Sequence, residues 1–202
     1  MFYPSTFLRD LGSIRKTLAF VTFLFILGIA VGWYSTGALS ELINQQMNGI
    51  REISNQLSLS AHPKWSFFVF IFFNNSIKAV LMIFLGLFIG VLPVLFLLVN
   101  GMVVGLLVHT SINHGESLFD LVVKGLLPHG IIEIPAIIIA SAFGIQMGLL
   151  VLSSFGGSGK GELRARWREA FRKAVTASVW IVILLFVAAI IESTVTFTLM
   201  KG

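Results

Sequence analysis

Two ionisable side chains lie one helical turn apart near the start of an apolar run. The run covers residues 126–152, which is long enough to cross a bilayer, and it contains His129 and Glu133. Moving a carboxylate into hydrocarbon costs about 2.5 to 3.5 kcal/mol, so Glu133 needs a partner or a functional role. Ionisable residues inside a membrane commonly mark a path for protons, ions or substrates.

Other apolar runs of the chain also contain polar side chains. They are Asn74, Asn75, Lys78, Asn100 and Glu192. If the runs cross the membrane in alternating directions, Lys78 lies at the same depth as Glu133 and Glu192, and the charges nearly cancel. Two interpretations remain open: a paired network that fixes helix register, and a hydrated site that titrates during transport.

Metal binding and catalysis are two further functions to which these residue types are suited. His129 and Glu133 supply two metal ligands, and His109 and Glu192 could complete a four-ligand site, although nothing in their spacing requires one. The sequence has no His-Glu-x-x-His or Gly-x-Ser-x-Gly motif and no cysteine. The Gly159-Lys160 pair lacks the remaining residues of a Walker loop. We therefore expect neither catalytic residues nor a cofactor.

Composition indicates which elements must position these side chains. Of 202 residues, 56% are hydrophobic and only 11% are charged, whereas about 25% are charged in a typical soluble domain. Five runs are long enough to span a bilayer: residues 17–34, 67–92, 93–109, 126–152 and 174–199. We predict one integral membrane domain over residues 1–202, an all-α bundle that crosses the cytoplasmic membrane five times.

The distribution of Lys and Arg predicts the orientation of this bundle. Three cations precede the first run, and six more lie between the fourth and fifth runs in residues 160–173. Cytoplasmic loops are enriched in Lys and Arg, so we predict a cytoplasmic N-terminus and an external C-terminus. The second and third runs are almost contiguous, and Pro93 favours a helix start there, which predicts a tight hairpin around residues 92–94.

Two amphipathic segments are expected outside the spans. In the outer segment, residues 35–66, the apolar stripe is formed by Leu39, Ile43, Met47, Ile50, Ile53 and Leu57. This stripe could pack onto the bundle, lie among lipid headgroups, or dock a partner helix. In the cytoplasmic segment, residues 163–173, an apolar face is flanked by Arg164, Arg166, Arg168, Arg172 and Lys173. This pattern predicts an interfacial helix that binds anionic lipid, and we expect no nucleic-acid partner.

Glycines recur at a four-residue spacing in three of the runs. The pairs are Gly86 with Gly90, Gly101 with Gly105, and Gly144 with Gly148. Small residues at this spacing allow membrane helices to approach closely. The pairs predict a bundle that is compact or that associates with further copies of itself.

Three motifs together resemble the stage II sporulation protein M family. They are Asn74-Asn75-Ser-Ile-Lys78, Asn100-Gly101-Met-Val-Val-Gly105, and the specific element Pro128-His129-Gly130-Ile-Ile-Glu133-Ile-Pro135-Ala136. The resemblance covers most of the chain, and the family extends to further bacterial and archaeal membrane proteins. In spore-forming bacteria it implies a membrane component that works with stage II sporulation proteins D and P. Those partners degrade peptidoglycan while the forespore is engulfed.

Two functional hypotheses follow from these observations. The first is a non-enzymatic scaffold that recruits proteins to a cell-envelope complex through the outer segment. The second is a transporter or export accessory for a small molecule or ion, in which Lys78, His129, Glu133 and Glu192 form a titrating site. Five spans cannot divide into two inverted halves, which favours the scaffold.

Overall fold

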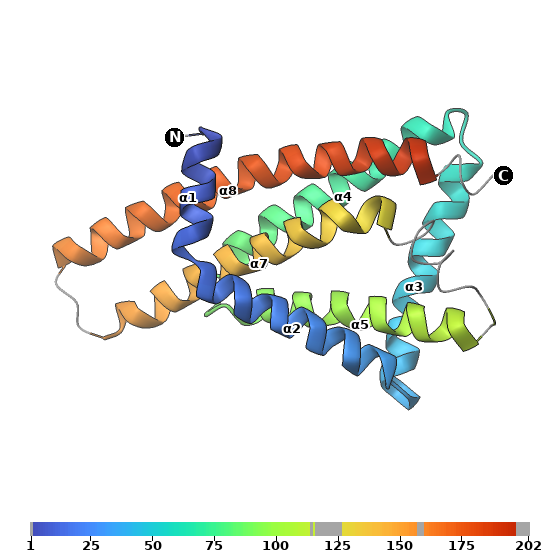
Figure 1. Ribbon diagram of the computed structural model, residues 1–202, viewed down its shortest axis with the longest axis horizontal. Coiled ribbons are helices and arrows are strands. Elements are labelled where there is room, and N and C mark those ends of the chain that lie inside the picture. The colour runs from blue at the N-terminus through green and yellow to red at the C-terminus, as the bar shows by residue number, and fades with distance from the viewer. Residues whose placement is uncertain (1, 114, 116–126, 157–159, 197–202) are drawn as a thin grey trace.

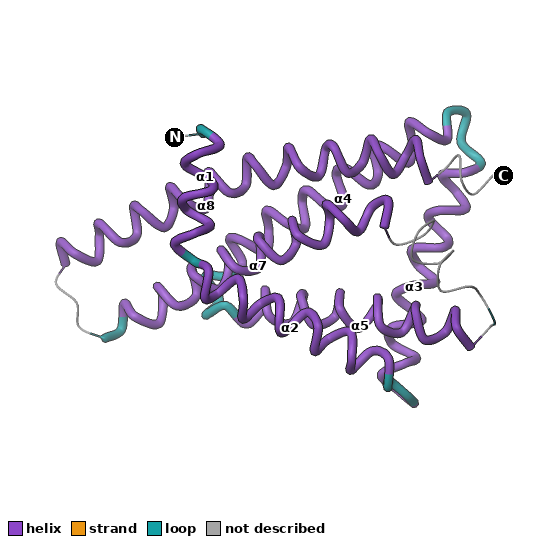
Figure 2. Tube along the Cα trace, viewed as in Figure 1, coloured by secondary structure: helices purple, strands orange, loops and turns teal. Residues whose placement is uncertain are grey.

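The protein is described by a computed structural model that covers residues 2–113, 115, 127–156 and 160–196. These residues form helices joined by short turns (Figure 2). The helices are α1 (Pro4–Ser13), α2 (Arg15–Trp33), α3 (Gly37–Ser58), α4 (Pro63–Leu85), α5 (Val91–Asn113), α7 (Leu127–Ser154) and α8 (Lys160–Ile191), followed by the π-helical turn η2 (Glu192–Thr196).

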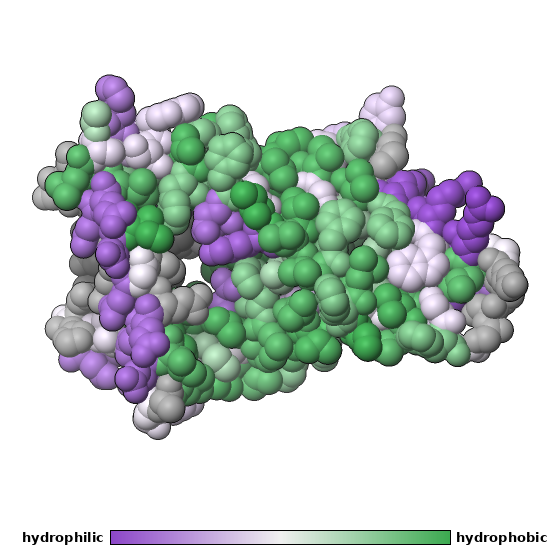
Figure 3. Space-filling view, turned by 180° about the vertical axis from the view of Figure 1, so that it is seen from behind, coloured by the Kyte–Doolittle hydropathy of each residue, from purple (hydrophilic) through white to green (hydrophobic). Residues whose placement is uncertain are grey.

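Five helices of the described chain, α2, α4, α5, α7 and α8, are long and apolar enough to cross a membrane. They run side by side, whereas α3 crosses one end of the bundle and α1 crosses α8 near the other end (Figure 1). The molecular surface has a broad apolar band between hydrophilic regions at the two ends (Figure 3). The predicted all-helical, multi-pass plan is therefore confirmed.

The turn between α4 and α5 differs from the sequence prediction. Residues 86–90 form it, so Pro93 lies inside the first turn of α5 rather than in the connection. The chain reverses through Ile89 and Gly90, which both have positive φ values, 59° and 75°. The helices then diverge, because α4 packs against α7 and α8 whereas α5 packs mainly against α2. The prediction of a tight α4–α5 hairpin around residues 92–94 was wrong.

Glycines form two lines of close contact between helices, which we call the glycine seams. In the first, Gly101 of α5 faces Gly28 of α2, and Gly105 of α5 and Gly32 of α2 each meet the backbone of the other helix. A methyl group added to Gly101 would lie 2.5 Å from the Phe25 carbonyl oxygen. In the second seam, Gly144 of α7 meets Gly86, and Gly148 meets Gly90. Each predicted glycine pair therefore packs against another segment of the same chain. Self-association through these glycines remains a prediction.

The outer amphipathic segment forms α3, which packs against α4 and α5. Ile43 is buried with 4% of its surface exposed, and Met47 and Leu57 are half-buried. Leu39 and Ile53 are exposed, and the side chain of Ile50 lies outside the described residues. Only part of the predicted stripe is therefore covered by the bundle.

The basic segment is not a separate helix. It forms the first turns of α8, which continues without a break for 32 residues from Lys160 to Ile191. The sequence between residues 162 and 191 contains no Gly or Pro that would interrupt it. The described chain follows the predicted fifth span to Thr196 through η2, and residues 197–199 of that span lie outside the description.

Candidate functional site

Asn74, Asn75 and Lys78 of α4 lie within about one turn of the helix. Asn74 donates a hydrogen bond from Nδ2 to Oδ1 of Asn75, at 3.1 Å, and both residues are half-buried. Lys78 follows one turn later and is exposed. The three residues therefore present amide and ammonium groups to the neighbouring helices at this part of α4.

Glu133 of α7 is the carboxylate that meets this group. Its side chain lies close enough to the Asn75 amide and to Lys78 for electrostatic interaction with both. Glu192, the first residue of η2, is in turn close enough to Glu133 for their charges to interact. The contacts of η2 with α4, α7 and α8 explain why these residues converge. The structure thus brings together Asn75, Lys78, Glu133 and Glu192.

Asn100 of the predicted network and His109 of the possible metal site have different surroundings. Asn100 donates from Nδ2 to the Phe96 carbonyl oxygen of its own helix, at 2.7 Å. His109 lies against the Trp33 ring of α2, with ring centroids 5.3 Å apart, and its Nε2 is 3.1 Å from Asn113 Nδ2. His129 falls in the first turn of α7, and its side chain lies outside the described residues.

This geometry limits the chemistry open to the polar network. Within the described residues, no three His, Asp or Glu side chains form a group that could hold a metal ion. His109 in particular packs on α2 and is not grouped with Glu133 and Glu192. Two carboxylates beside an amide and an ammonium group can pair their charges or share a proton. The network joins α4, α7 and η2, so it can also fix their relative register.

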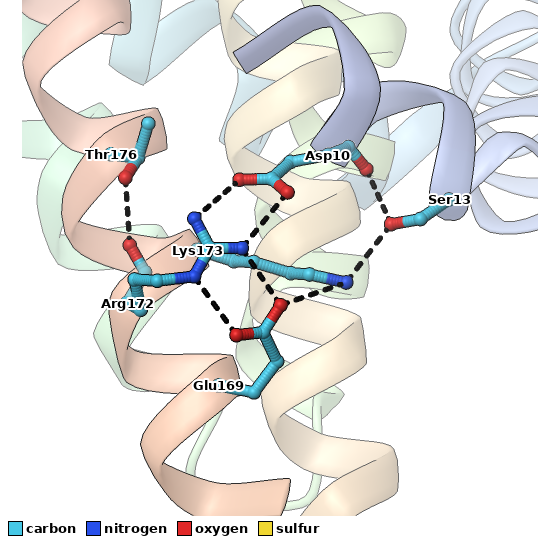
Figure 4. A network of polar contacts seen from close by, with 6 residues as sticks. All are labelled: Asp10, Ser13, Glu169, Arg172, Lys173 and Thr176. Atoms are coloured by element: carbon cyan, nitrogen blue, oxygen red, sulfur yellow. Dashed lines mark hydrogen bonds and ion pairs between the residues drawn. The ribbon is translucent and has the colours of Figure 1, made fainter. Parts of the chain in front are cut away.

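A second polar cluster lies at the end of the bundle where α2 and α8 begin and α7 ends, which we call the basic end (Figure 1). Asp10 of α1 is buried, with 2% of its surface exposed, and it accepts two hydrogen bonds from the Arg172 guanidinium at 3.0 and 3.1 Å. Arg172 also pairs with Glu169, and Lys173 donates to the Ser13 hydroxyl (Figure 4). These contacts tie α1 to α8.

Sequence reasoning missed Asp10, although a signal was present. Asp10 lies on the same face of α1 as Phe7, three residues earlier, and close to Ile14, which begins the bend into α2, and all three are buried. An acid on the apolar face of a helix requires a cationic partner. Phe7 stacks on Trp180 of α8, with centroids 6.0 Å apart, so apolar contact supports the ion pair.

The five basic residues predicted to face lipid have different surroundings. Arg172 and Lys173 are half-buried and turn toward α1 (Figure 4). Arg164, Arg166 and Arg168 are exposed. Arg166 also donates to the Ser153 hydroxyl at 3.0 Å, which links α8 to the end of α7. A role at the lipid surface remains a prediction for the three exposed arginines.

Comparison with curated proteins and with solved structures gives no match. A family model described as Stage II sporulation protein M matches residues 21–197. The matched region contains both glycine seams, the polar network and the basic segment of α8, and it excludes α1 with Asp10. The chain belongs to the stage II sporulation protein M family, whose name associates it with sporulation, and its five apolar helices are those of a multi-pass membrane protein.

Proposed function

We propose that the protein is a non-enzymatic scaffold that recruits extracytoplasmic proteins to a cell-envelope complex in the cytoplasmic membrane. Membership of the stage II sporulation protein M family supports this role. Its partners would be the peptidoglycan-degrading proteins of forespore engulfment, as the resemblance implies. The main structural support for this proposal is the position of α3.

Helix α3 offers an apolar surface outside the spanning helices. It lies across the end of the bundle opposite the basic end, between the end of α2 and the start of α4 (Figure 1). Ile43 anchors it to the bundle, whereas Leu39, Leu42 and Ile53 remain exposed. An amphipathic helix with additional apolar residues beyond its buried stripe is suited to docking a partner.

The polar network has a structural role in this proposal. Glu133 with Asn75 and Lys78 would set the register of α7 against α4, and Glu192 would link η2 to the same place by sharing a proton with Glu133. A correct register keeps the start of α4 in place, and α3 packs against α4. The network would therefore support the docking surface without taking part in any reaction.

The proposal predicts that polar substitutions on α3 remove partner binding. In the double variant Leu42→Gln and Ile53→Gln, we expect recovery of co-purified peptidoglycan hydrolases to fall roughly 10- to 30-fold. The matched control is Gln45→Ser with Asn48→Ser, which alters exposed polar positions of the same helix. Both variants should accumulate in the membrane at the level of the unchanged protein.

Two measurements in the native host test this prediction. Affinity purification from detergent extracts measures partner recovery, and fluorescence microscopy of membranes measures engulfment. Unchanged partner recovery in the Leu42→Gln, Ile53→Gln variant would contradict the docking surface. Normal engulfment in a strain that lacks the protein would contradict the role in sporulation.

A further inference from the structure

The end of α7 extends past the start of α2 at the basic end. Gln146 of α7 donates a side-chain hydrogen bond to the Thr17 hydroxyl of α2, which places these two residues at the same depth. Arg15 and Lys16 begin α2, so this depth corresponds to the edge of the hydrocarbon layer. The eight residues that follow Gln146, up to Ser154, then carry α7 about 12 Å further, into the headgroup region.

A cleft lies between α7 and α8 beside Gln146 and the residues that follow it. Its volume is about 450 Å³, within the size range of small-molecule sites. The floor is apolar and is formed by residues that include Phe143, Met147 and Leu150 of α7. Small residues of α8, Ala165, Ala170 and Ala174, leave the space open on the other side.

The rim of the cleft is cationic. Arg166 and Lys173 both line it, and Glu169 lies between them along α8. Glu169 also lines the cleft, and its carboxylate accepts from Arg172 at 2.7 and 2.9 Å and lies 3.7 Å from Lys173 Nζ, so it offsets part of the positive charge. The two basic segments that meet at this end, residues 1–18 and 160–173, contain nine cationic and three acidic residues. An anion at the rim is therefore favoured.

We propose that this cleft binds one anionic phospholipid molecule. The phosphate lies between Arg166 and Lys173, and an acyl chain occupies the apolar floor between α7 and α8. Basic pockets between spanning helices on the cytoplasmic side are suited to such headgroups. This goes beyond a diffuse attraction of the basic segment to the membrane, because it assigns a bound lipid to named residues.

The surroundings of the cleft favour a lipid over a cytoplasmic protein. Leu149 and Leu152 at the end of α7 are exposed, as are Phe155 in the following turn and Phe171 on α8. Exposed apolar residues interspersed with arginines at headgroup depth are typical of segments that insert into the interface. The acyl chain would thus enter the cleft from the bilayer that already surrounds these residues.

The test uses the purified full-length chain in a neutral detergent, with lipid binding measured by native mass spectrometry. Dioleoylphosphatidylglycerol should bind roughly tenfold or more tightly than dioleoylphosphatidylcholine. Inorganic phosphate should not compete, because it lacks the acyl chain. The double variant Arg166→Gln, Lys173→Gln should lose the preference for phosphatidylglycerol. The matched control Arg164→Gln, Arg168→Gln removes the same charge from residues outside the cleft and should keep the preference.

A third variant fills the apolar space of the cleft from the α8 side without altering an ion pair. Ala165→Leu adds bulk to the cleft and should weaken binding of both lipids. If the two charge variants lose the preference for phosphatidylglycerol equally, the lipid is attracted diffusely by the basic segment and the proposal is overturned. Equal binding of the two lipids by the unchanged protein would also overturn it. Unchanged phosphatidylglycerol binding in Ala165→Leu would also overturn the proposal. If Lys173→Gln prevents folding, the Ala165→Leu variant alone tests the proposal. Site-specific crosslinking of the cleft to a cytoplasmic protein instead of lipid would favour a protein partner.

Discussion

At the scale of single residues, the buried Asp10 carboxylate accepts two hydrogen bonds from the Arg172 guanidinium. A buried ion pair is costly to form, and removing one partner is costlier because it leaves the other charge uncompensated. The two partners differ here, since Asp10 is almost fully buried whereas the Arg172 side chain is 26% exposed. Arg172 also has a second acid, Glu169, at 2.7 Å. The consequences of removing each partner should therefore be unequal.

We predict that Arg172→Met reduces the free energy of unfolding by about 3 to 5 kcal/mol, because it leaves the Asp10 carboxylate buried without its main cation. Asp10→Asn should cost less, about 1 to 3 kcal/mol, since Arg172 retains Glu169. The control Glu162→Gln changes an exposed acid at the start of α8 and should stay within about 0.5 kcal/mol. Unfolding in mixed micelles with increasing dodecyl sulfate measures all three. A larger loss for Asp10→Asn than for Arg172→Met would contradict the pairing.

At the scale of helices, the glycine seams determine which helices are neighbours. Bilayer lipid is as apolar as the helices, so close packing and not hydrophobic burial must hold spanning helices together. Gly28 and Gly32 allow the α2 backbone to contact α5 at Gly101 and Gly105. This contact explains why α5 leaves α4, its neighbour in sequence, and packs along α2 instead.

We predict that Gly101→Ala destabilises the bundle by about 1 to 3 kcal/mol, because the added methyl group meets backbone atoms of α2 that cannot move aside. Gly49→Ala is the matched control, since it lies within α3 and its methyl group meets nothing within 4 Å. The control should be neutral or more stable by up to about 1 kcal/mol, as alanine favours a helix. Thermal unfolding in detergent measures the difference. Equal stability of the two variants would contradict the seam.

Hydropathy and charge were sufficient to predict the helical elements that cross the membrane. The five runs became α2, α4, α5, α7 and α8, because a stretch of about 20 apolar residues has few alternatives in a bilayer. The turn at residues 86–90 was missed because the apolar run continues through it without a polar residue. Its two glycines, Gly86 and Gly90, were the available signal, and they were interpreted only as packing residues.

The candidate sites were harder to predict, because they depend on contacts between distant segments. Membrane depth can be predicted from the alternating direction of the spans. It was sufficient to group Glu133, Lys78 and Asn75. Asn100 was included only because it is a polar residue inside a predicted span, and it bonds to the Phe96 carbonyl of its own helix. Asp10 and Arg172 are 162 residues apart, and only the path of α1 across α8 brings them together.

At the scale of the whole molecule, the two basic segments lie at one end of the bundle and α3 lies at the other (Figure 1). This distribution gives the molecule an electrostatic axis along its spanning helices. Moving one charge across the membrane against a potential of 100 mV costs about 2.3 kcal/mol, so a cluster of cations strongly opposes translocation. The basic end should remain in the cytoplasm, where the membrane surface is anionic.

We predict that α3 faces the outside of the cell and that the start of α8 faces the cytoplasm. The chain contains no cysteine, so Ser58→Cys in α3 and Gly161→Cys in α8 each introduce a single reactive thiol at an exposed position. In intact cells a membrane-impermeant maleimide should label the Ser58→Cys variant, whereas the Gly161→Cys variant should react only after permeabilisation. The unchanged chain is the control for background labelling. The reverse pattern would place α3 in the cytoplasm and would remove the basis for recruitment of peptidoglycan hydrolases, since their substrate lies outside the membrane.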